Sequence, residues 1–190
     1  SCYDEMDKAD FPNKNQPEWP GFFLEYRLEK FIADNGVQNK IRYSQNKGKD
    51  EIDLDIFLPQ VDCFGDLKAH SNDSKGIQGN DWDTVMSVLN DSSIYYIVCD
   101  HDTIKDKDCG YEVTLYWNNK LGKSNPMSYS TRMKNKVILT GYKVLEINRY
   151  NMQYLSEFHQ GHNSNGDARA KKIMIKTSDI NNFLIHQVNF

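Results

Sequence analysis

Three carboxylates and one lysine fall on two neighbouring segments in which polar and apolar residues alternate. The segment EIDLDIFL carries Asp53 and Asp55, and the segment CFGDLKAH, which follows it closely, carries Asp66 and Lys68. Side chains on a strand point alternately to its two faces, so within each segment the charged residues share one face and the apolar residues the other. The pattern predicts two strands whose charged faces come together.

The connection between these strands fixes which charged residues meet. If Pro59-Gln60-Val61-Asp62 is a four-residue hairpin connection, Asp55 lies opposite Asp66 and Asp53 opposite Lys68, on the same side of the sheet. Opposed carboxylates repel each other, so the cluster stays ionised only with a divalent cation, and oxygen ligands suit Mg²⁺. We expect Asp55, Asp66 and Asp53 to be metal ligands, with the choice of Asp53 or Asp55 as principal ligand left open.

The spacing of these residues resembles that of the PD-(D/E)XK nuclease superfamily, which includes many restriction endonucleases. The matching elements are an aspartate, Asp53 or Asp55, followed on the next strand by Asp66-x-Lys68. Upstream, GFFLEYRLEKFIADNG looks like the first helix of that superfamily, which often carries a glutamate near the metal, here Glu25. The sequence departs from the motif because no proline precedes either first aspartate, and the second acid is Asp instead of the commoner Glu.

The resemblance implies an α/β (α+β) fold, restriction-endonuclease-like, with a mixed central sheet flanked by helices. We interpret residues 1–20 as an extended lead-in or linker and residues 21–190 as a single nuclease domain. Its catalytic core would span about 21–102, and a basic, nucleic-acid-contacting part about 103–190. With 190 residues, of which 38% are apolar, the chain is long enough for one full core.

Several elements are expected around this hairpin. The pattern predicts a helix over 25–34 that stops at Asn35-Gly36, a polar connector over 71–80 and a helix that starts near Asp81. A buried strand over 93–99 should follow, and we leave Asp100-His101-Asp102 at its end out of the site because strand ends commonly collect polar residues. Further strands are expected at these ranges: 111–117, 137–139, 142–147 and 172–176.

In the expected chemistry, Mg²⁺, with Mn²⁺ as a substitute, is held against a scissile phosphate and lowers the pKa of a bound water. Lys68 would orient or help deprotonate that water, and Glu25 would approach a second metal or a metal-bound water. The alternatives are that Glu25 is an exposed helix carboxylate and that Asp66 and Lys68 are solvent-facing charges on an edge strand. The catalytic candidates are therefore Glu25, Asp53, Asp55, Asp66 and Lys68.

Charge is distributed unevenly along the chain. Residues 1–102 carry 10 Lys and Arg against 20 Asp and Glu, whereas residues 103–190 carry 13 against 7. A basic half beside an acidic, metal-binding half suits an enzyme that acts on a polyanion, although solvated faces also produce such divisions. The candidate phosphate contacts are His70, Lys120, Lys123, Arg132, Lys134, Lys136, Arg169, Lys171 and Lys172.

We expect a Mg²⁺-dependent endonuclease that cuts DNA, of the restriction type and cytoplasmic, with a homodimer as the arrangement that duplex cutting commonly uses. One alternative is the nuclease domain of a secreted antibacterial toxin, which would cut DNA or tRNA and bind an immunity protein. Another is a nucleic-acid-binding or interaction module that cuts nothing. No stretch of the sequence approaches the roughly 20 apolar residues of a membrane-spanning helix.

Overall fold

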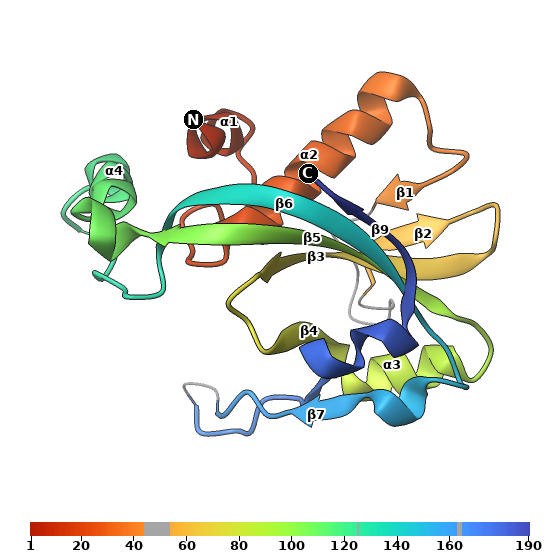
Figure 1. The fold of residues 1–190 in the computed structure, drawn as a ribbon. Helices are drawn as coiled ribbons and strands as arrows, with labels where there is room; N and C mark the ends of the chain where they lie inside the picture. The colour runs from red at the N-terminus through yellow and green to blue at the C-terminus, as the bar shows by residue number, and fades with distance from the viewer. Residues whose placement is uncertain (44–53, 125, 163–164) are drawn as a thin grey trace.

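The computed structural model describes residues 1–43, 54–124, 126–162 and 165–190, which form two sheets and the helices around them (Figure 1). The helices are α1 (Cys2–Lys8), α2 (Trp19–Asn35), α3 (Trp82–Leu89) and α4 (Glu112–Leu121), with 3-10 turns η1 (Asp106–Cys109), η2 (Met152–Tyr154) and η3 (Thr177–Asn182). The strands are β1 (Arg42–Tyr43), β2 (Ile56–Leu58), β3 (Cys63–Ser71), β4 (Gly76–Asp81), β5 (Ile94–Lys105), β6 (Lys134–Ile147), β7 (Ser156–Phe158), β8 (Lys172–Lys176) and β9 (Leu184–Asn189).

The larger sheet is six-stranded, with the order β1-β2-β3-β5-β6-β9. All neighbours run antiparallel except β3 and β5, which are parallel. Parallel strands need a crossover connection, and here the chain passes through β4 and α3 between them. The expectation of a mixed sheet flanked by helices is confirmed, and most of the strand pairs in it are antiparallel.

The β2–β3 hairpin has the predicted register. Ile56 pairs with Gly65 and Leu58 with Cys63, so the connection is the four residues Pro59–Asp62. Extending this register by one residue places Asp55, just before β2, opposite Asp66. The predicted pairing of Asp53 with Lys68 lies outside the described residues.

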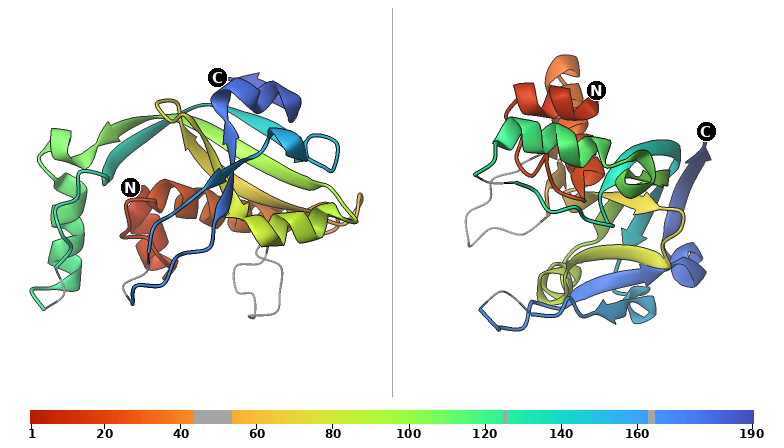
Figure 2. Two further views of the ribbon diagram at one scale, coloured as in Figure 1. Left: turned by 90° about the horizontal axis from the view of Figure 1, so that it is seen from below. Right: turned by 90° about the vertical axis from the view of Figure 1, so that its left-hand side faces the viewer.

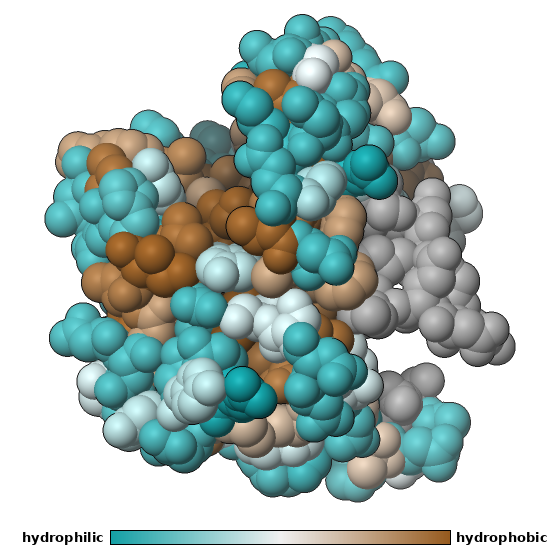
Figure 3. All heavy atoms as spheres, turned by 90° about the vertical axis from the view of Figure 1, so that its right-hand side faces the viewer, coloured by the Kyte–Doolittle hydropathy of each residue, from teal (hydrophilic) through white to brown (hydrophobic). Residues whose placement is uncertain are grey.

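The smaller sheet, β4-β8-β7, lies with α3 under one face of the larger sheet (Figures 1 and 2). Its apolar residues Ile77, Ile173 and Ile175 belong to the same buried cluster as Ile94 and Val98 of β5. Viewed from the right-hand side of Figure 1, hydrophobic residues gather in a band between hydrophilic upper and lower parts (Figure 3). The main core therefore lies between the two sheets.

Residues 1–20 form a helix and a packed segment, where the sequence analysis expects an extended lead-in. Ser1 and Asp4 form a capping box at the start of α1, and α2 already begins at Trp19. The side chains of Met6, Phe11 and Trp19 are buried in a second cluster against α4. Apolar residues this widely spaced among acids and prolines give no periodic signal, so the sequence alone does not reveal that they pack.

The strand predicted over residues 111–117 is wrong, because these residues lie mainly in the helix α4. Val113, Thr114 and Trp117 are the buried residues of this helix, which is a helical and not an alternating spacing. The buried carboxylate of Asp106 accepts hydrogen bonds from the backbone N–H groups of Val113 and Thr114 at 2.9 and 3.0 Å. The helix is capped by a residue well upstream of its first turn, so the usual adjacent capping signal is missing.

Other predicted boundaries were also wrong. The expected polar connector over 71–80 contains β4, which pairs with β8, and β5 continues through Asp100-His101-Asp102 to Lys105. The strands expected at 137–139 and 142–147 are one long strand, β6.

The helix predicted to stop at Asn35-Gly36 does stop there. Gly36 is left-handed (φ 62°), and its backbone N–H donates to the carbonyl oxygen of Ile32. None of the helices in the described part of the chain has the length and apolar character that crossing a membrane requires.

Candidate active site

Asp66 and Lys68 lie in the middle of β3, which is hydrogen-bonded to β2 on one side and to β5 on the other. The Lys68 Nζ and Asp66 Oδ2 atoms are 2.5 Å apart, and Asp66 is 3% exposed. A carboxylate this deeply buried is costly unless it is paired and hydrogen-bonded. The interpretation of these two residues as solvent charges on an edge strand is therefore wrong.

Two residues that sequence reasoning missed hold the Asp66 carboxylate from the opposite side. The Asn80 side-chain amide donates to Asp66 Oδ2 at 2.7 Å. The Tyr96 hydroxyl donates to Asn80 Oδ1 at 2.7 Å and accepts from the Asn80 backbone N–H at 3.1 Å. Tyr96 is the register partner of Asp66 on the parallel strand β5. To identify these residues from the sequence, one would have to know that β3 and β5 pair.

Space for this network comes from Gly79. A Cβ atom built at Gly79 would lie 2.6 Å from the Tyr96 hydroxyl oxygen and closer still to the Ile173 side chain. Any larger residue would displace the hydroxyl from Asn80. The short segment before α3 thus contributes an amide at Asn80 and the room that the amide needs.

Glu25 on α2 lies close to the acids of the hairpin. Burial, and after it the negative charges of Asp55 and Asp66, raise the pKa of Glu25 to about 7, against the opposing effects of Tyr43 and Lys68. Tyr43 on β1 donates a hydrogen bond to Glu25 Oε2 at 3.1 Å. Burial, and after it the negative charges of Glu25 and Asp55, also raise the pKa of the Tyr43 hydroxyl. Glu25 is therefore half-buried in a negative environment, and the interpretation of it as an ordinary exposed helix carboxylate is wrong.

The structure thus brings together four of the five predicted catalytic residues, Glu25, Asp55, Asp66 and Lys68, from α2 and the β2–β3 hairpin. The fifth, Asp53, lies outside the described residues. Tyr43 is a further member that the sequence analysis missed, because its short strand, β1, gives almost no pattern of its own.

The donor chemistry of this cluster fits a hard divalent cation. Its carboxylates are oxygen ligands, and burial together with the negative charges of Asp55 and Asp66, which Lys68 offsets only in part, raises the pKa of Glu25. In the part of the chain that the structure describes, no group of three His, Cys, Asp or Glu side chains has the spacing of a metal site. The acids have the oxygen ligands and the negative charge that a divalent cation requires, but in this arrangement it is Lys68 that contacts Asp66.

A cavity of about 540 Å³ adjoins these residues, and Glu25, Lys68 and His70 line it together with Lys134 and Lys172. The cavity is formed between α2, β3, β4 and the start of β6 and β8. It therefore combines acids on one side with basic side chains from segments far apart in the sequence. A polyanion could approach the cluster of Glu25, Asp66 and Lys68 through it.

Only three of the predicted phosphate contacts, His70, Lys134 and Lys172, line this cavity. Lys120 and Lys171 pair with acids away from the cavity, with Asp7 at 3.2 Å and Glu157 at 2.8 Å. Arg132 does not line the cavity but pairs with Glu18, an acid that does, at 2.6 Å. Lys123, Lys136 and Arg169 are exposed and do not line the cavity. The basic excess of residues 103–190 is therefore spread over the molecule, and only part of it faces the candidate site.

Neither a comparison with protein-family models nor a search of curated proteins finds a match to this sequence. Function is therefore inferred from the fold and the side-chain geometry.

Proposed function

We propose that the protein is a divalent-cation-dependent endonuclease of the PD-(D/E)XK type, which hydrolyses phosphodiester bonds of DNA. The observation that carries this proposal is the buried Asp66, bonded to Lys68 on the same strand and close to Glu25 of the preceding helix. A buried acid and a lysine beside further acids, next to a cavity, form an arrangement that a folded protein rarely keeps without a functional reason.

The order of the elements supports the same proposal. Helix α2 is followed by the antiparallel strands β1, β2 and β3, and the α3 crossover then leads to β5, parallel to β3. This order of helix, antiparallel strands, helix and buried strand resembles the core of the PD-(D/E)XK nucleases. Asp66 and Lys68 lie on the central strand, where the motif of that superfamily requires them.

Asp55 and Asp66 would hold the Mg²⁺ ion, or Mn²⁺ in its place, and Glu25 would contact a water bound to the ion. When bound, the cation would neutralise charge on the scissile phosphate and lower the pKa of water. Asn80 and Tyr96 keep the Asp66 carboxylate in one orientation, so that this ligand does not have to be ordered when the cation arrives.

The side chains of the protein can supply the remaining chemistry. Hydrolysis forms a bond between a water oxygen and phosphorus and breaks the bond from phosphorus to the leaving sugar oxygen. A base takes a proton from the attacking water, and the leaving oxygen gains a proton from solvent water. The Lys68 ammonium can donate hydrogen bonds to the attacking water or to a phosphate oxygen, and thereby stabilise the charge that develops. Glu25, with a pKa of about 7, is suited to accept a proton near neutral pH.

The test is an assay of nucleic-acid cleavage. Supercoiled plasmid and total tRNA are each incubated with the protein in Mg²⁺ and in EDTA, then with Asp66→Asn and Lys68→Ala. Asp73→Asn, an exposed acid just after β3, is the matched control. We expect cleavage of DNA that requires Mg²⁺, is lost in both site variants and is unchanged in the control.

The products separate the remaining alternatives. Discrete DNA fragments indicate a restriction-type enzyme, whereas a smear, or cleaved tRNA, indicates a toxin nuclease that an immunity protein would have to restrain. Intact substrates under all conditions would contradict the proposal, and binding without cleavage would leave an interaction module as the function.

A further inference from the structure

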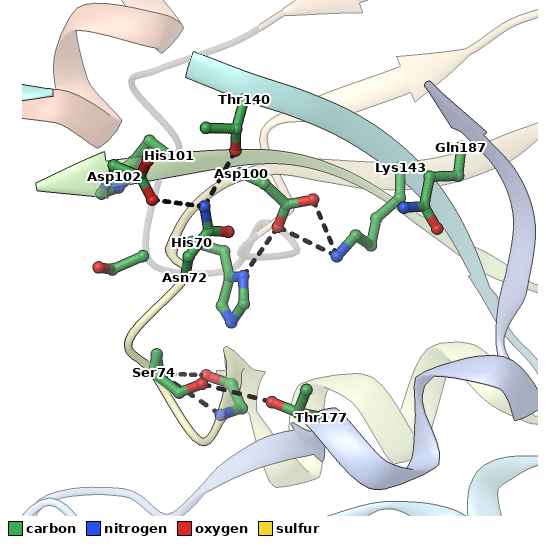
Figure 4. A network of polar contacts seen from close by, with 12 residues as sticks. His70, Asn72, Ser74, Asp100, His101, Asp102, Thr140, Lys143, Thr177 and Gln187 are labelled. Atoms are coloured by element: carbon green, nitrogen blue, oxygen red, sulfur yellow. Dashed lines mark hydrogen bonds and ion pairs between the residues drawn. The ribbon is translucent and has the colours of Figure 1, made fainter. Parts of the chain in front are cut away.

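A second buried polar network lies further along the same face of β3 (Figure 4). His70 Nδ1 is 2.8 Å from Asp100 Oδ1, and Lys143 Nζ contacts both oxygens of Asp100, at 3.0 and 2.8 Å. Asp100 is the register partner of His70 on β5, and Lys143 comes from β6. Exposure is 6% for His70, 7% for Asp100 and 8% for Lys143, so the three side chains form a buried, fixed unit.

One atom of this unit lacks a partner. His70 Nε2 is buried and makes no hydrogen bond within the described residues. His70 also lines the cavity next to Glu25 and Lys68, and its Nε2 points away from Asp100, toward Ser74 and Thr177 (Figure 4). Buried polar atoms are normally satisfied, so an orphaned ring nitrogen at a cavity wall indicates a ligand that supplies the missing hydrogen bond.

The surroundings indicate the charge of that ligand. Lys143 neutralises the charge of Asp100. The carboxylate that holds the His70 ring therefore adds little net negative charge to this part of the cavity. The cavity wall carries Lys68, Lys134 and Lys172 against Glu18 and Glu25, among the described residues.

The acids on that wall are largely compensated. Glu18 is itself paired with Arg132 at 2.6 Å, and Glu25 accepts a hydrogen bond from Tyr43 at 3.1 Å. Lys68 is paired with Asp66 at 2.5 Å and Lys172 with Asp81 at 3.6 Å, whereas Lys134 has no carboxylate partner among the described residues. The charge of Lys134 favours an anion over a metal ion near His70 Nε2.

The position of His70 along β3 indicates which anionic group it would contact. His70 is two residues beyond Lys68 on the same face, a separation of roughly 7 Å along a strand. A second phosphate of the same nucleic-acid strand, next to one bound at Asp66 and Lys68, is therefore within the range of His70.

We propose that His70, held by Asp100 and Lys143, binds a backbone phosphate next to the one that is cut. This inference rests on the proposed nuclease function for the position of the scissile phosphate. In its doubly protonated form the His70 ring donates Nδ1–H to Asp100 and can donate Nε2–H to a phosphate oxygen, and Lys134 contributes positive charge. Asp100 and Lys143 act through His70 and are positioning residues.

The experiment measures binding without cleavage. Fluorescence anisotropy gives the Kd for a labelled DNA duplex and for an RNA of the same sequence, in EDTA and again in Ca²⁺, over a range of KCl concentrations. The variants are His70→Ala and the matched control His159→Ala, which removes an exposed histidine. We expect His70→Ala to weaken binding about 10-fold and to lower the slope of log Kd against log salt by about one, since one phosphate contact is lost. The control should change neither quantity, and the arm that binds more tightly identifies DNA or RNA as the source of the phosphate.

A second readout keeps the inference testable if the variant is poorly folded. In the wild-type protein, the imidazole ¹⁵N resonance of His70 Nε2 should shift when the duplex is added, and inorganic phosphate should shift it less. An unmoved resonance, an unchanged Kd in His70→Ala, or a wild-type protein that binds neither nucleic acid would overturn the inference. If binding depends on His70 but nothing is cleaved in Mg²⁺, the phosphate site stands and the proposed nuclease function falls.

Discussion

Glu25→Gln should stabilise the metal-free protein, and the gain should depend on pH. The ordinary pKa of the glutamate is 4.5, and in the folded protein burial and the neighbouring charges raise it to about 7. At 1.36 kcal/mol per pKa unit, a full expression of this rise corresponds to about 3 kcal/mol. Glu25 is only half-buried, so solvent screening reduces the expected effect to about 1–3 kcal/mol.

The direction follows from proton linkage. The folded protein keeps the Glu25 proton up to about pH 7, whereas the unfolded chain releases it near pH 4.5. Stability is therefore lost as the pH rises through this window, and the cost is complete above about pH 7. Glutamine has no proton to lose, so Glu25→Gln avoids the cost at pH 8 and gains less than about 1 kcal/mol at pH 5.

Urea denaturation in EDTA at pH 5 and pH 8 measures this difference. Glu29→Gln, an exposed carboxylate one turn further along α2, is the matched control and should show the same free energy change at both pH values. Addition of Mg²⁺ at pH 8 should remove the advantage of Glu25→Gln, because the cation stabilises the wild-type carboxylates. An equal effect of Glu25→Gln at the two pH values, or destabilisation at pH 8, would refute this account of Glu25.

Two further predictions concern the buried networks behind the site. Tyr96→Phe removes the hydroxyl that bonds Asn80 twice, and should lower the free energy of unfolding by about 1–3 kcal/mol in urea denaturation; a loss below about 0.5 kcal/mol would show that the hydroxyl does not fix Asn80. Lys143→Met leaves the buried Asp100 carboxylate with the His70 contact but without its lysine, and should cost up to about 3–5 kcal/mol. Lys30→Ala breaks only an exposed ion pair, so it should cost less than about 1 kcal/mol in the same assay, and equal losses in the two lysine variants would contradict the role of Lys143.

The hairpin and its neighbouring helix could be predicted from local patterns. Alternation in the two hairpin segments and the length of the Pro59–Asp62 connection determine one register, and β2 and β3 have it. Asn35-Gly36 likewise marks the end of α2, because glycine adopts the left-handed conformation there without strain. These features depend on residues close together in the sequence.

The features that could not be predicted depend on contacts between distant segments. Asn80 reaches Asp66 only because the chain turns into β4, and Tyr96 reaches Asn80 only because β5 pairs with β3. In the sequence, Asp100 is one of several polar residues at a predicted strand end, which gives no reason to assign it to the site. In the structure β5 continues past Asp100, and this residue contacts His70. The helix α4 was read as a strand because its cap, Asp106, acts from the preceding turn.

The most direct test of the nuclease proposal is the single-turnover rate of plasmid cleavage in Mg²⁺ by the wild-type protein and by Lys68→Ala. A lysine that stabilises the transition state contributes on the order of 100-fold or more, so the variant should cut at least about 100 times more slowly while it still binds DNA. A variant that cuts as fast as the wild-type protein, or a wild-type protein that cuts equally well in EDTA, would contradict the proposal.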